Sequence, residues 1–538
     1  MRVVQEAGPV RPQLGRDLAE ELASARARLA ARVAATVDGS GRARAPVCGR
    51  ILETALTLRL LQLERVEPAA QDRLVGYLCR ARAGPRSVSH DDEAERLEAA
   101  VLGWALGDGA DDLDAAEDAF VAETAGFVAA RKRWMTHALA GIFGRMADSG
   151  GTIPPLRTDS ATPTAHWVPV LLSAFRVISQ TSRGAAASAD PDDVATLRLV
   201  VATPGIWERQ ILTHLVAAHA LCRVEGGTPL IRDAIDQVLA FQRKDGGIPN
   251  IPDQDVFCTA IAGLALEGTT PWEPLRTRMA EYLIGEQQSD GGWGFSEGVR
   301  QTDVDDTSVC MEFLHSTAPR GHTAVADRAI RYLLRIQNGD GGFPTWIRGA
   351  DSEPAMTAAA LNALPPVHRG PAGAAVAFLR RSRLPNGAFA PGWSRSNANA
   401  LFRAALGCRR HPLGGDELLH GCVDYIMRTA NPDGGWGQQP GEPSDAISTA
   451  FSLITLCQGP SAGPVLRRGL RWFLDQQESD GSYRSRPDSR GPRPFLYDAP
   501  DLTNIYALLA LTHVAHRYTP RATTPALAAR IHDPSDSA

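Results

Sequence analysis

The sequence predicts an all-α protein with a closed six-repeat α/α toroid in its second half and a second helical domain before it. Three observations lead to this fold class. A short turn signal recurs at a nearly constant period in the second half, an apolar helical segment follows each copy, and strand patterns are weak throughout. A chain of 538 residues is also too long for one ordinary core, so more than one domain is expected.

Each repeat is marked by an Asp-Gly or Asn-Gly pair that follows a Gln-rich or basic stretch, as in "EQQSDGGWGF" and "RTANPDGGWG". Successive markers are separated by 45, 50, 46, 47 and 47 residues. Glycine supplies the positive φ that ends one helix, so each marker is expected to form the turn into the next helix. The six markers are Asp245, Asp290, Asp340, Asn386, Asp433 and Asp480.

The helix after each marker, such as "AISTAFSLITL", is apolar nearly all round, whereas the helix before it is amphipathic. Apolar helices are buried, so they are expected to form an inner layer with the amphipathic helices outside. Six such pairs form a solenoid or a ring, and the buried inner layer favours a closed ring around a central cavity. Trp293 and Trp436, which follow their turns directly, are expected to clamp the repeats.

The rest of the chain divides in order along the sequence. Residues 1–29 are expected to form an N-terminal helix that packs on the repeat domain. Residues 30–205 are expected to form a helical domain, with segments such as "ILETALTLRLLQLERV" and "FVAARKRWMTHALAGIFG". The toroid is expected over residues 206–520, and the Pro-, Ala- and charge-rich segment 521–538 is expected to be a disordered tail.

Composition limits the classes of function. With a net charge of −5 and no basic tail or RNA-binding motif, the chain is not expected to bind nucleic acid. It has no signal-peptide core and no segment near the ~18 apolar residues of a membrane span. Eight cysteines without a CxxC pair are typical of free thiols in a reducing compartment. We therefore expect a cytoplasmic protein without integral membrane contact, of open oligomeric state.

Three carboxylates, Asp303, Asp305 and Asp306, stand within four positions at the mouth of the second inner helix. One of them could cap that helix, but capping explains only one. A zinc site would need His or Cys partners, and only Cys310 is nearby. A carboxylic acid in an apolar cavity keeps its proton, because burial and neighbouring carboxylates disfavour ionisation, and such an acid could protonate an alkene.

The DxDD sequence followed by Thr, set within these repeats, resembles the class II terpene cyclases. These are relatives of squalene–hopene cyclase and of bacterial copalyl and drimenyl diphosphate synthases. The resemblance covers about 210–515, including "LYDAPDLTNIYALLAL", and is weaker over the first 200 residues. It implies two α/α-barrel domains, of β and γ type. It also implies protonation-initiated cyclisation of a linear isoprenoid diphosphate that keeps its diphosphate, such as farnesyl diphosphate giving drimenyl diphosphate.

The resemblance also implies roles for particular residues. Asp305 would be the general acid, while Asp303 and Asp306 would orient it and stabilise the carboxylate left behind. Phe295 matches a cavity phenylalanine of the squalene cyclases, and Phe257 falls where they carry a cavity tryptophan. The faces of such rings would stabilise carbocations.

Other implied features depart from the family pattern. Thr357 is expected in the substrate pocket, where many bacterial relatives carry a polar pair. A diphosphate substrate implies Mg²⁺ and basic residues, but the metal ligands are unassigned. Candidates are Glu208 and the acidic run 111–118, which a solvated loop also explains. The basic run 130–134 could hold phosphate, or it could form a charged outer helix face.

Several alternatives stay open. Geranylgeranyl diphosphate could be the substrate and give a copalyl-type product, or the chain could be a squalene–hopene-like cyclase. A class I terpene synthase is loosely suggested by "DDEAE" at 91–95, but a convincing second metal motif is lacking. A protein prenyltransferase β subunit would need an Asp-Cys-His zinc site, which could not be assembled. The toroid could also be a binding module without chemistry, and the triple carboxylate argues against that.

Overall fold

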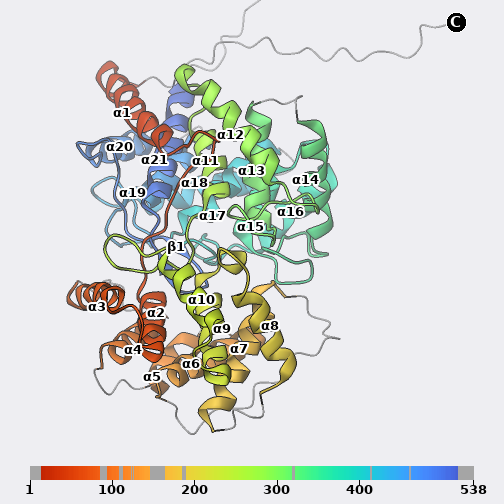
Figure 1. Ribbon diagram of the computed structural model, residues 1–538. Coiled ribbons are helices and arrows are strands. Elements are labelled where there is room, and N and C mark those ends of the chain that lie inside the picture. Colours follow the sequence, from red (N-terminus) through yellow and green to blue (C-terminus); the bar gives the residue numbers. More distant parts are fainter. Residues whose placement is uncertain are drawn as a thin grey trace, which may run out of the picture.

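The computed structural model describes residues 14–518 except 85–93, 108–112, 123, 125, 146–163, 185–188, 318–321, 412–414 and 460–461. This part of the chain is almost entirely helical and forms two lobes, one on top of the other (Figure 1). The strands among these residues are β1 Ser489–Arg490 and β2 Leu496–Tyr497, which pair antiparallel where the lobes meet. The expected tail at 521–538 lies outside the described residues.

Six apolar helices form the inner ring of the upper lobe, the toroid. Each packs against the next, and the last packs against the first, so that the ring is closed. Their small side chains, alanine above all, allow the close approach that a ring of helices needs. The inner helices are α11 Asp255–Ala265, α13 Val304–Thr317, α15 Pro354–Ala363, α17 Ala398–Arg410, α19 Ala446–Gln458 and α21 Pro500–Tyr518.

Amphipathic helices cover the outside of this ring. They are α12 Glu273–Glu286, α14 Thr323–Ile336, α16 Arg369–Arg381, α18 Asp416–Arg428 and α20 Gly463–Asp475, completed by α1 Arg16–Ala35 from the other end of the chain. Helix α1 packs on α20, α21 and α11. It therefore fills the outer position beside the point of ring closure.

The marker turns are built as the sequence predicts. The Asp290 carboxylate accepts a hydrogen bond from the backbone N–H of Gly292 at 3.0 Å. Gly291 between them has a φ of +95°, and a β-carbon there would lie 2.5 Å from the Arg328 carbonyl oxygen. Only glycine fits this position, because it needs both the left-handed backbone and the missing side chain.

A glutamine ties each of several turns to the next outer helix. The Gln287 amide donates to the carbonyls of Gly291, at 2.9 Å, and Val325, at 3.0 Å. Gln477 donates in the same way to Ala25 of α1, at 3.1 Å. Helix α1 thus takes the place that the next outer helix holds in the other repeats. This repeated bond explains the Gln-rich stretch before the markers.

The N-terminal lobe has a core of its own. It consists of α2 Ile51–Glu64, α3 Pro68–Ala83, α4 Glu95–Leu106, α5 Leu113–Val121, α6 Gly126–Ile142, α7 Trp167–Ser182, α8 Pro191–Val201, α9 Ile211–Glu225 and α10 Pro229–Leu239. The two cores divide between Ile248 and Ile251, not at residue 206 as expected. Helices α9 and α10 pack against α2 and α8 instead of the toroid. The reason is that α1 already occupies the outer position that α10 was expected to take.

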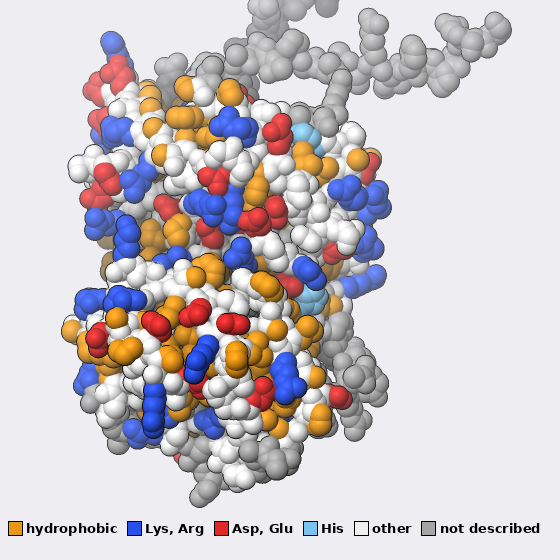
Figure 2. Space-filling model, in the orientation of Figure 1, with side chains coloured by type: hydrophobic (Ala, Val, Ile, Leu, Met, Phe, Trp, Pro, Cys, Tyr) orange, Lys and Arg blue, Asp and Glu red, His pale blue; other side chains and the backbone are white. Residues whose placement is uncertain are grey.

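Acidic and basic side chains are interspersed over most of the face drawn in Figure 2, with several basic ones gathered along its right edge. Short 3₁₀ helices lie at Trp207–Arg209 and Thr270–Trp272.

Among the helices described, none is both long enough and apolar enough to cross a bilayer.

Candidate active site

A cavity of about 550 Å³ opens where the toroid meets the N-terminal lobe. This volume lies within the range of about 300–1,000 Å³ of small-molecule sites. Most of its wall is apolar or aromatic, with Leu171 contributed by the N-terminal lobe and Phe257, Phe295, Met356 and Ile447 by the toroid. We call it the central cavity. Phe257 and Phe295 therefore lie in the wall where the sequence places them.

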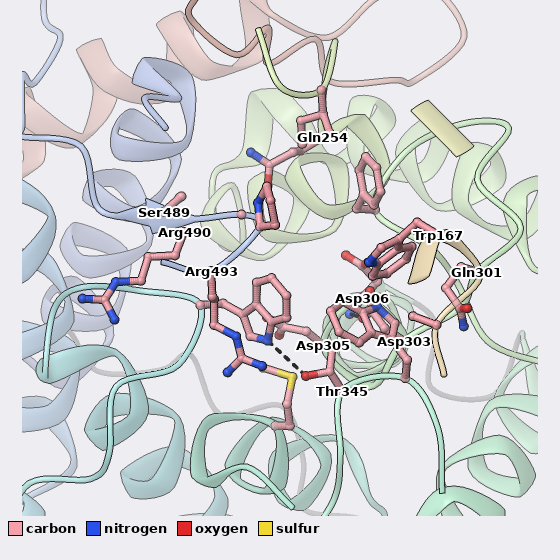
Figure 3. A pocket seen from close by; sticks show the side chains of 18 of the residues that line it. Trp167, Gln254, Gln301, Asp303, Asp305, Asp306, Thr345, Ser489, Arg490 and Arg493 are labelled. Carbon is pink, nitrogen blue, oxygen red and sulfur yellow. Dashed lines mark hydrogen bonds between the residues drawn. The ribbon is translucent and has the colours of Figure 1, made fainter. Parts of the chain in front are cut away.

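The three aspartates of the DxDD sequence gather on one side of this cavity (Figure 3). Helix α13 begins at Val304, so Asp303 precedes its first turn. The Asp303 carboxylate accepts a hydrogen bond from the backbone N–H of Asp306 at 2.8 Å, which is the geometry of a helix cap. One carboxylate of the three thus has a structural role, and that carboxylate is Asp303. The other two belong to the first turn and face the cavity.

Burial changes the protonation of this group. It raises the pKa of Asp303 to about 6. Burial, and then the charge of Asp303, hold the pKa of Asp306 well above its usual range. The two side chains are hydrogen-bonded to each other. A pair of carboxyl groups in this arrangement shares a proton, because two negative charges this close disfavour each other in an apolar site.

Asp305 has a different environment. Its carboxylate forms an ion pair with Arg403 of α17, whose guanidinium also donates to the Tyr506 hydroxyl at 3.4 Å. The Arg403 side chain is 10% exposed and that of Asp305 19%. Sequence reasoning missed Arg403, although an arginine in the apolar inner helix "NANALFRAAL" is a signal that could have identified it.

Three tryptophans that were not predicted line the central cavity: Trp167, Trp346 and Trp393. Trp346 stands edge-on to each of the other two, with ring centroids 4.6 Å from Trp167 and 4.9 Å from Trp393. The Trp393 indole N–H donates to the Thr345 hydroxyl at 3.0 Å (Figure 3). Their electron-rich faces suit a site that stabilises positive charge.

The tryptophans that clamp the repeats and those that line the cavity differ in their distance from the marker turn. Trp293 and Trp436 stand three residues after their markers and are buried. Their indole N–H groups donate to the Leu283 and Ile426 carbonyls, at 2.7 and 2.8 Å, which confirms that they clamp the repeats. The tryptophans of the cavity stand further along: Trp346 and Trp393 lie six and seven residues after Asp340 and Asn386.

The prediction that Thr357 lies in the substrate pocket is wrong. Thr357 is fully buried away from the cavity, and its hydroxyl accepts a hydrogen bond from the backbone N–H of Phe343 at 2.9 Å. Thr307 and Thr449 accept from Trp293 and Trp436 in the same way, at 3.1 and 3.0 Å. A threonine at this point of the inner helix thus anchors the preceding turn.

The mouth of the cavity carries basic and apolar side chains together. Arg131 of α6 lines it, from the basic run 130–134, beside the half-exposed Phe127 and Val128. Burial lowers the pKa of Arg131, and the positive charge of nearby Arg493 lowers it further. Arg493 pairs with Glu353 at 2.8 Å. Two guanidinium groups that repel each other in a cavity mouth form a site that attracts an anion.

Carboxylates near this mouth are few. Glu208 lines the cavity, but one of its oxygens already accepts the backbone N–H groups of Arg300 and Gln301, at 2.8 and 3.1 Å. Among the described residues, no group of three or more His, Cys, Asp or Glu side chains could hold a metal ion. The residues therefore do not fit an all-protein metal cage. Glu208 and the exposed Asp351 both line the cavity, and one or two carboxylates suffice where substrate phosphates supply the other ligands of a Mg²⁺ ion.

The other acidic candidates do not reach the cavity. The described part of the run 111–118 belongs to α5, where Glu117 pairs with His137 at 2.9 Å and lies 3.5 Å from Arg133. Most of the "DDEAE" segment, residues 91–93, lies outside the described residues. Cys310 is buried in α13, and burial raises its pKa, as for a core thiol.

Comparisons with known proteins agree with this geometry. The model of the prenyltransferase α/α toroid domain matches residues 209–372 and 308–490. Drimenyl diphosphate synthases of Streptantibioticus cattleyicolor and Streptomyces showdoensis are 38% and 39% identical, each over 91% of this chain and 94% of the relative. Ent-copalyl diphosphate synthase from Streptomyces platensis has the same fold, with a TM-score of 0.58, 17% identity and coverage of 92% of this chain and 99% of that structure.

Proposed function

This chain belongs to the bacterial class II terpene cyclases, and on that premise we propose that it converts farnesyl diphosphate to drimenyl diphosphate. The names and the near full-length coverage of the two synthases support this choice of substrate and product. The observation that carries the proposal is the set of three aspartates facing an aromatic cavity with two arginines at its mouth.

In the proposed mechanism Asp305 is the general acid. Its proton adds to the terminal double bond of the prenyl chain, whose π electrons form the new C–H bond and leave a tertiary cation. The next double bond attacks this cation and closes the first ring, and the third closes the second ring. A proton beside the final cation then leaves to solvent, and the electrons of its C–H bond form a new double bond. The reaction is therefore an isomerisation, and the bond between carbon and diphosphate oxygen stays intact.

Asp303 and Asp306 prepare this acid. Asp303 fixes the first turn of α13, and the proton shared between Asp303 and Asp306 keeps negative charge beside Asp305 low. A low negative charge in this neighbourhood suits a side chain that acts as a carboxylic acid in an apolar site. Most of the cavity wall is apolar or aromatic, which limits the access of water to the carbocations.

The aromatic wall stabilises the cations that form along the chain. A cation over an indole or phenyl ring gains about 0.5–2 kcal/mol, depending on how far water is excluded. The faces of Trp167, Trp346, Trp393, Phe257 and Phe295 supply such surfaces on several sides of the cavity. They also fold the prenyl chain, because their rings set the shape of the space it fills.

At the mouth, Arg131 and Arg493 would hold the diphosphate. A guanidinium forms paired, charge-assisted hydrogen bonds with phosphate oxygens. Mg²⁺, held by the diphosphate and by Glu208 and Asp351, would neutralise part of its charge. The apolar Phe127 and Val128 beside them suit the first isoprene unit.

The proposal is tested by incubating the full chain with Mg²⁺ and either farnesyl or geranylgeranyl diphosphate, followed by phosphatase treatment and GC–MS. We expect bicyclic drimenol from the C15 substrate and at least tenfold slower conversion of the C20 substrate. Replacing Asp305 by Asn should abolish turnover, because an amide has no acidic proton. Faster conversion of geranylgeranyl diphosphate would establish the diterpene alternative, and unchanged turnover in Asp305→Asn would remove Asp305 as the acid.

A further inference from the structure

A second cavity, of about 760 Å³, lies toward the C-terminal ends of the inner helices, whereas the aspartates of the central cavity lie at the start of α13. We call it the distal cavity. All six inner helices contribute to its wall, mostly from their C-terminal halves. Unlike the central cavity it is rich in polar groups, among them Glu312, Asn362, Arg409, His513 and Arg517. Nothing in the cyclisation mechanism uses these groups.

Two side chains, Arg403 and Tyr506, line both cavities. They therefore stand in the partition between the site of cyclisation and the distal cavity. Arg403 is paired with Asp305 on the central side. Its Nε atom is buried and has no hydrogen-bond partner in the described part of the chain. A buried donor without a partner costs free energy, so another arrangement of the Arg403 side chain that satisfies this donor would be favourable.

A second carboxylate is available to Arg403 on the distal side. Glu312 follows Asp305 by seven residues on α13, so both project from the same face, about 10 Å apart along the helix axis. Arg403 faces this stripe from α17 and interacts electrostatically with both carboxylates. The Glu312 side chain is hydrogen-bonded to Asn362 of α15. The long arginine stem lets the guanidinium turn toward either carboxylate while its backbone stays in the helix.

We infer that Arg403 alternates between Asp305 and Glu312, and that Glu312 is a positioning residue that frees Asp305 to carry the catalytic proton. This inference rests on the proposed role of Asp305 as the acid. With Arg403 on Asp305, the guanidinium occupies the carboxylate oxygen on which Asp305 would carry the proton. With Arg403 on Glu312, Asp305 can take up a proton, and the arginine returns once Asp305 has given that proton to the alkene.

The exchange depends on the charge of Glu312. Burial raises the pKa of Glu312 to about 7, against the opposing effects of Asn362, Arg403 and Arg410. The other charged or titratable groups around it are Asp305 on its own helix and, in the cavity wall, Glu267, Arg409, Cys457, Tyr506, His513, His516 and Arg517. Above this pKa Glu312 is charged and attracts Arg403. Below it Glu312 is neutral, Arg403 stays on Asp305, and turnover should decrease.

A double-mutant cycle in the full chain tests the inference, with farnesyl diphosphate as substrate. We expect Glu312→Gln to lower kcat at least tenfold at pH 7.5 with KM within twofold, and to remove the rise of kcat between pH 6 and 8. In an Arg403→Gln background, where Asp305 has no arginine partner, Glu312→Gln should alter kcat less than twofold. Glu312→Asp should restore at least half of the activity. Glu267→Gln, a carboxylate of the same cavity, is the matched control and should leave kcat unchanged.

Equal losses from Glu312→Gln in both backgrounds would overturn the inference, as would no loss in either. Loss of turnover in the folded single variant Arg403→Gln would also overturn the inference. Catalysis would then require Arg403 itself, and not its departure from Asp305. If Arg403→Gln does not fold, the dependence of kcat on pH in Glu312→Gln decides the question. A rise of kcat between pH 6 and 8 like that of wild type would contradict the exchange of Arg403 between Asp305 and Glu312. Asp305→Asn distinguishes failure of this inference from failure of the proposed function. If Asp305 is not the acid, this variant should show normal turnover, whereas it should be inactive if only the exchange of Arg403 is wrong.

Discussion

Trp167 of the N-terminal lobe meets Trp346 of the toroid edge-on, with ring centroids 4.6 Å apart and planes at 84°. Trp167 belongs to α7 and Trp346 lies between α14 and α15, so this contact crosses the junction of the lobes at the wall of the central cavity. Neither lobe alone therefore encloses the cavity. The shape that folds the prenyl chain depends on how the two lobes pack.

Replacing Trp346 by Leu should lower kcat by about 2- to 30-fold, which corresponds to the ~0.5–2 kcal/mol of a lost cation–π contact. The wider cavity should also release monocyclic or hydroxylated products, because cations are then less well held and less well shielded from water. GC–MS of the dephosphorylated products measures both effects. Trp346→Phe keeps an aromatic face and should retain the bicyclic product. A normal rate and product from Trp346→Leu would show that this ring does not contact the reacting chain.

Replacing Arg131 by Gln should raise the KM for farnesyl diphosphate about 10- to 100-fold, since a charge-assisted hydrogen bond contributes roughly 1.5–3 kcal/mol. The value of kcat should change little, because the diphosphate is bound equally in the ground state and the transition state. Arg133→Gln is the matched control on the same helix, since Arg133 lies near Glu117 instead of the cavity. Equal KM values for the two variants would place the diphosphate elsewhere.

Replacing Trp436 by Phe should reduce stability but not chemistry. The change removes the hydrogen bond from the indole N–H to the Ile426 carbonyl, at 2.8 Å, and leaves that buried acceptor without its partner. A cost of about 1–3 kcal/mol is expected, visible as a lower Tm. Activity per folded molecule at 20 °C should stay within twofold of wild type. A selective loss of activity at normal Tm would contradict the clamp role.

Stability should fall as the pH rises from about 4 to 6. Burial raises the pKa of Asp303 to about 6 and that of Asp306 above its usual range, so the folded state holds protons that the unfolded chain has released. The unfolded pKa is about 3.9, and stability decreases with pH wherever the folded state binds more protons. Asp306→Asn should weaken this dependence of Tm on pH, whereas the exposed Asp327→Asn should match wild type. Parallel curves for all three proteins would contradict a shared buried proton.

The repeat could be predicted because its signals are local. An Asp-Gly turn, a glutamine before it and an apolar helix after it recur within each unit, and each has a physical function that the structure shows, as at Gln287 and Gly291. The position of the DxDD sequence follows from the same register. The division of the lobes could not be read in this way, because α1 and α10 are both amphipathic helices, and only ring closure decides which covers the toroid.

Only the part of the site that is contiguous in sequence could be predicted. The acid group is a contiguous motif, but its partner Arg403 is 98 residues from Asp305, and the basic Arg131 comes from the other lobe. Such contacts need the tertiary structure. Analogy of position predicts Thr357 in the pocket, whereas the equivalent threonine of another repeat, Thr307, anchors a turn as Thr357 does. The recurrence of this threonine between repeats is the sequence signal for that role.

The most direct test of the central claim is to run the reaction with farnesyl diphosphate in D₂O and to analyse the intact product by mass spectrometry. Protonation by an exchangeable carboxylic acid, followed by loss of a substrate hydrogen, predicts a bicyclic diphosphate that carries one deuterium, with no inorganic pyrophosphate released. An undeuterated product formed together with free pyrophosphate would contradict the account, since the reaction would then begin by ionisation of the diphosphate.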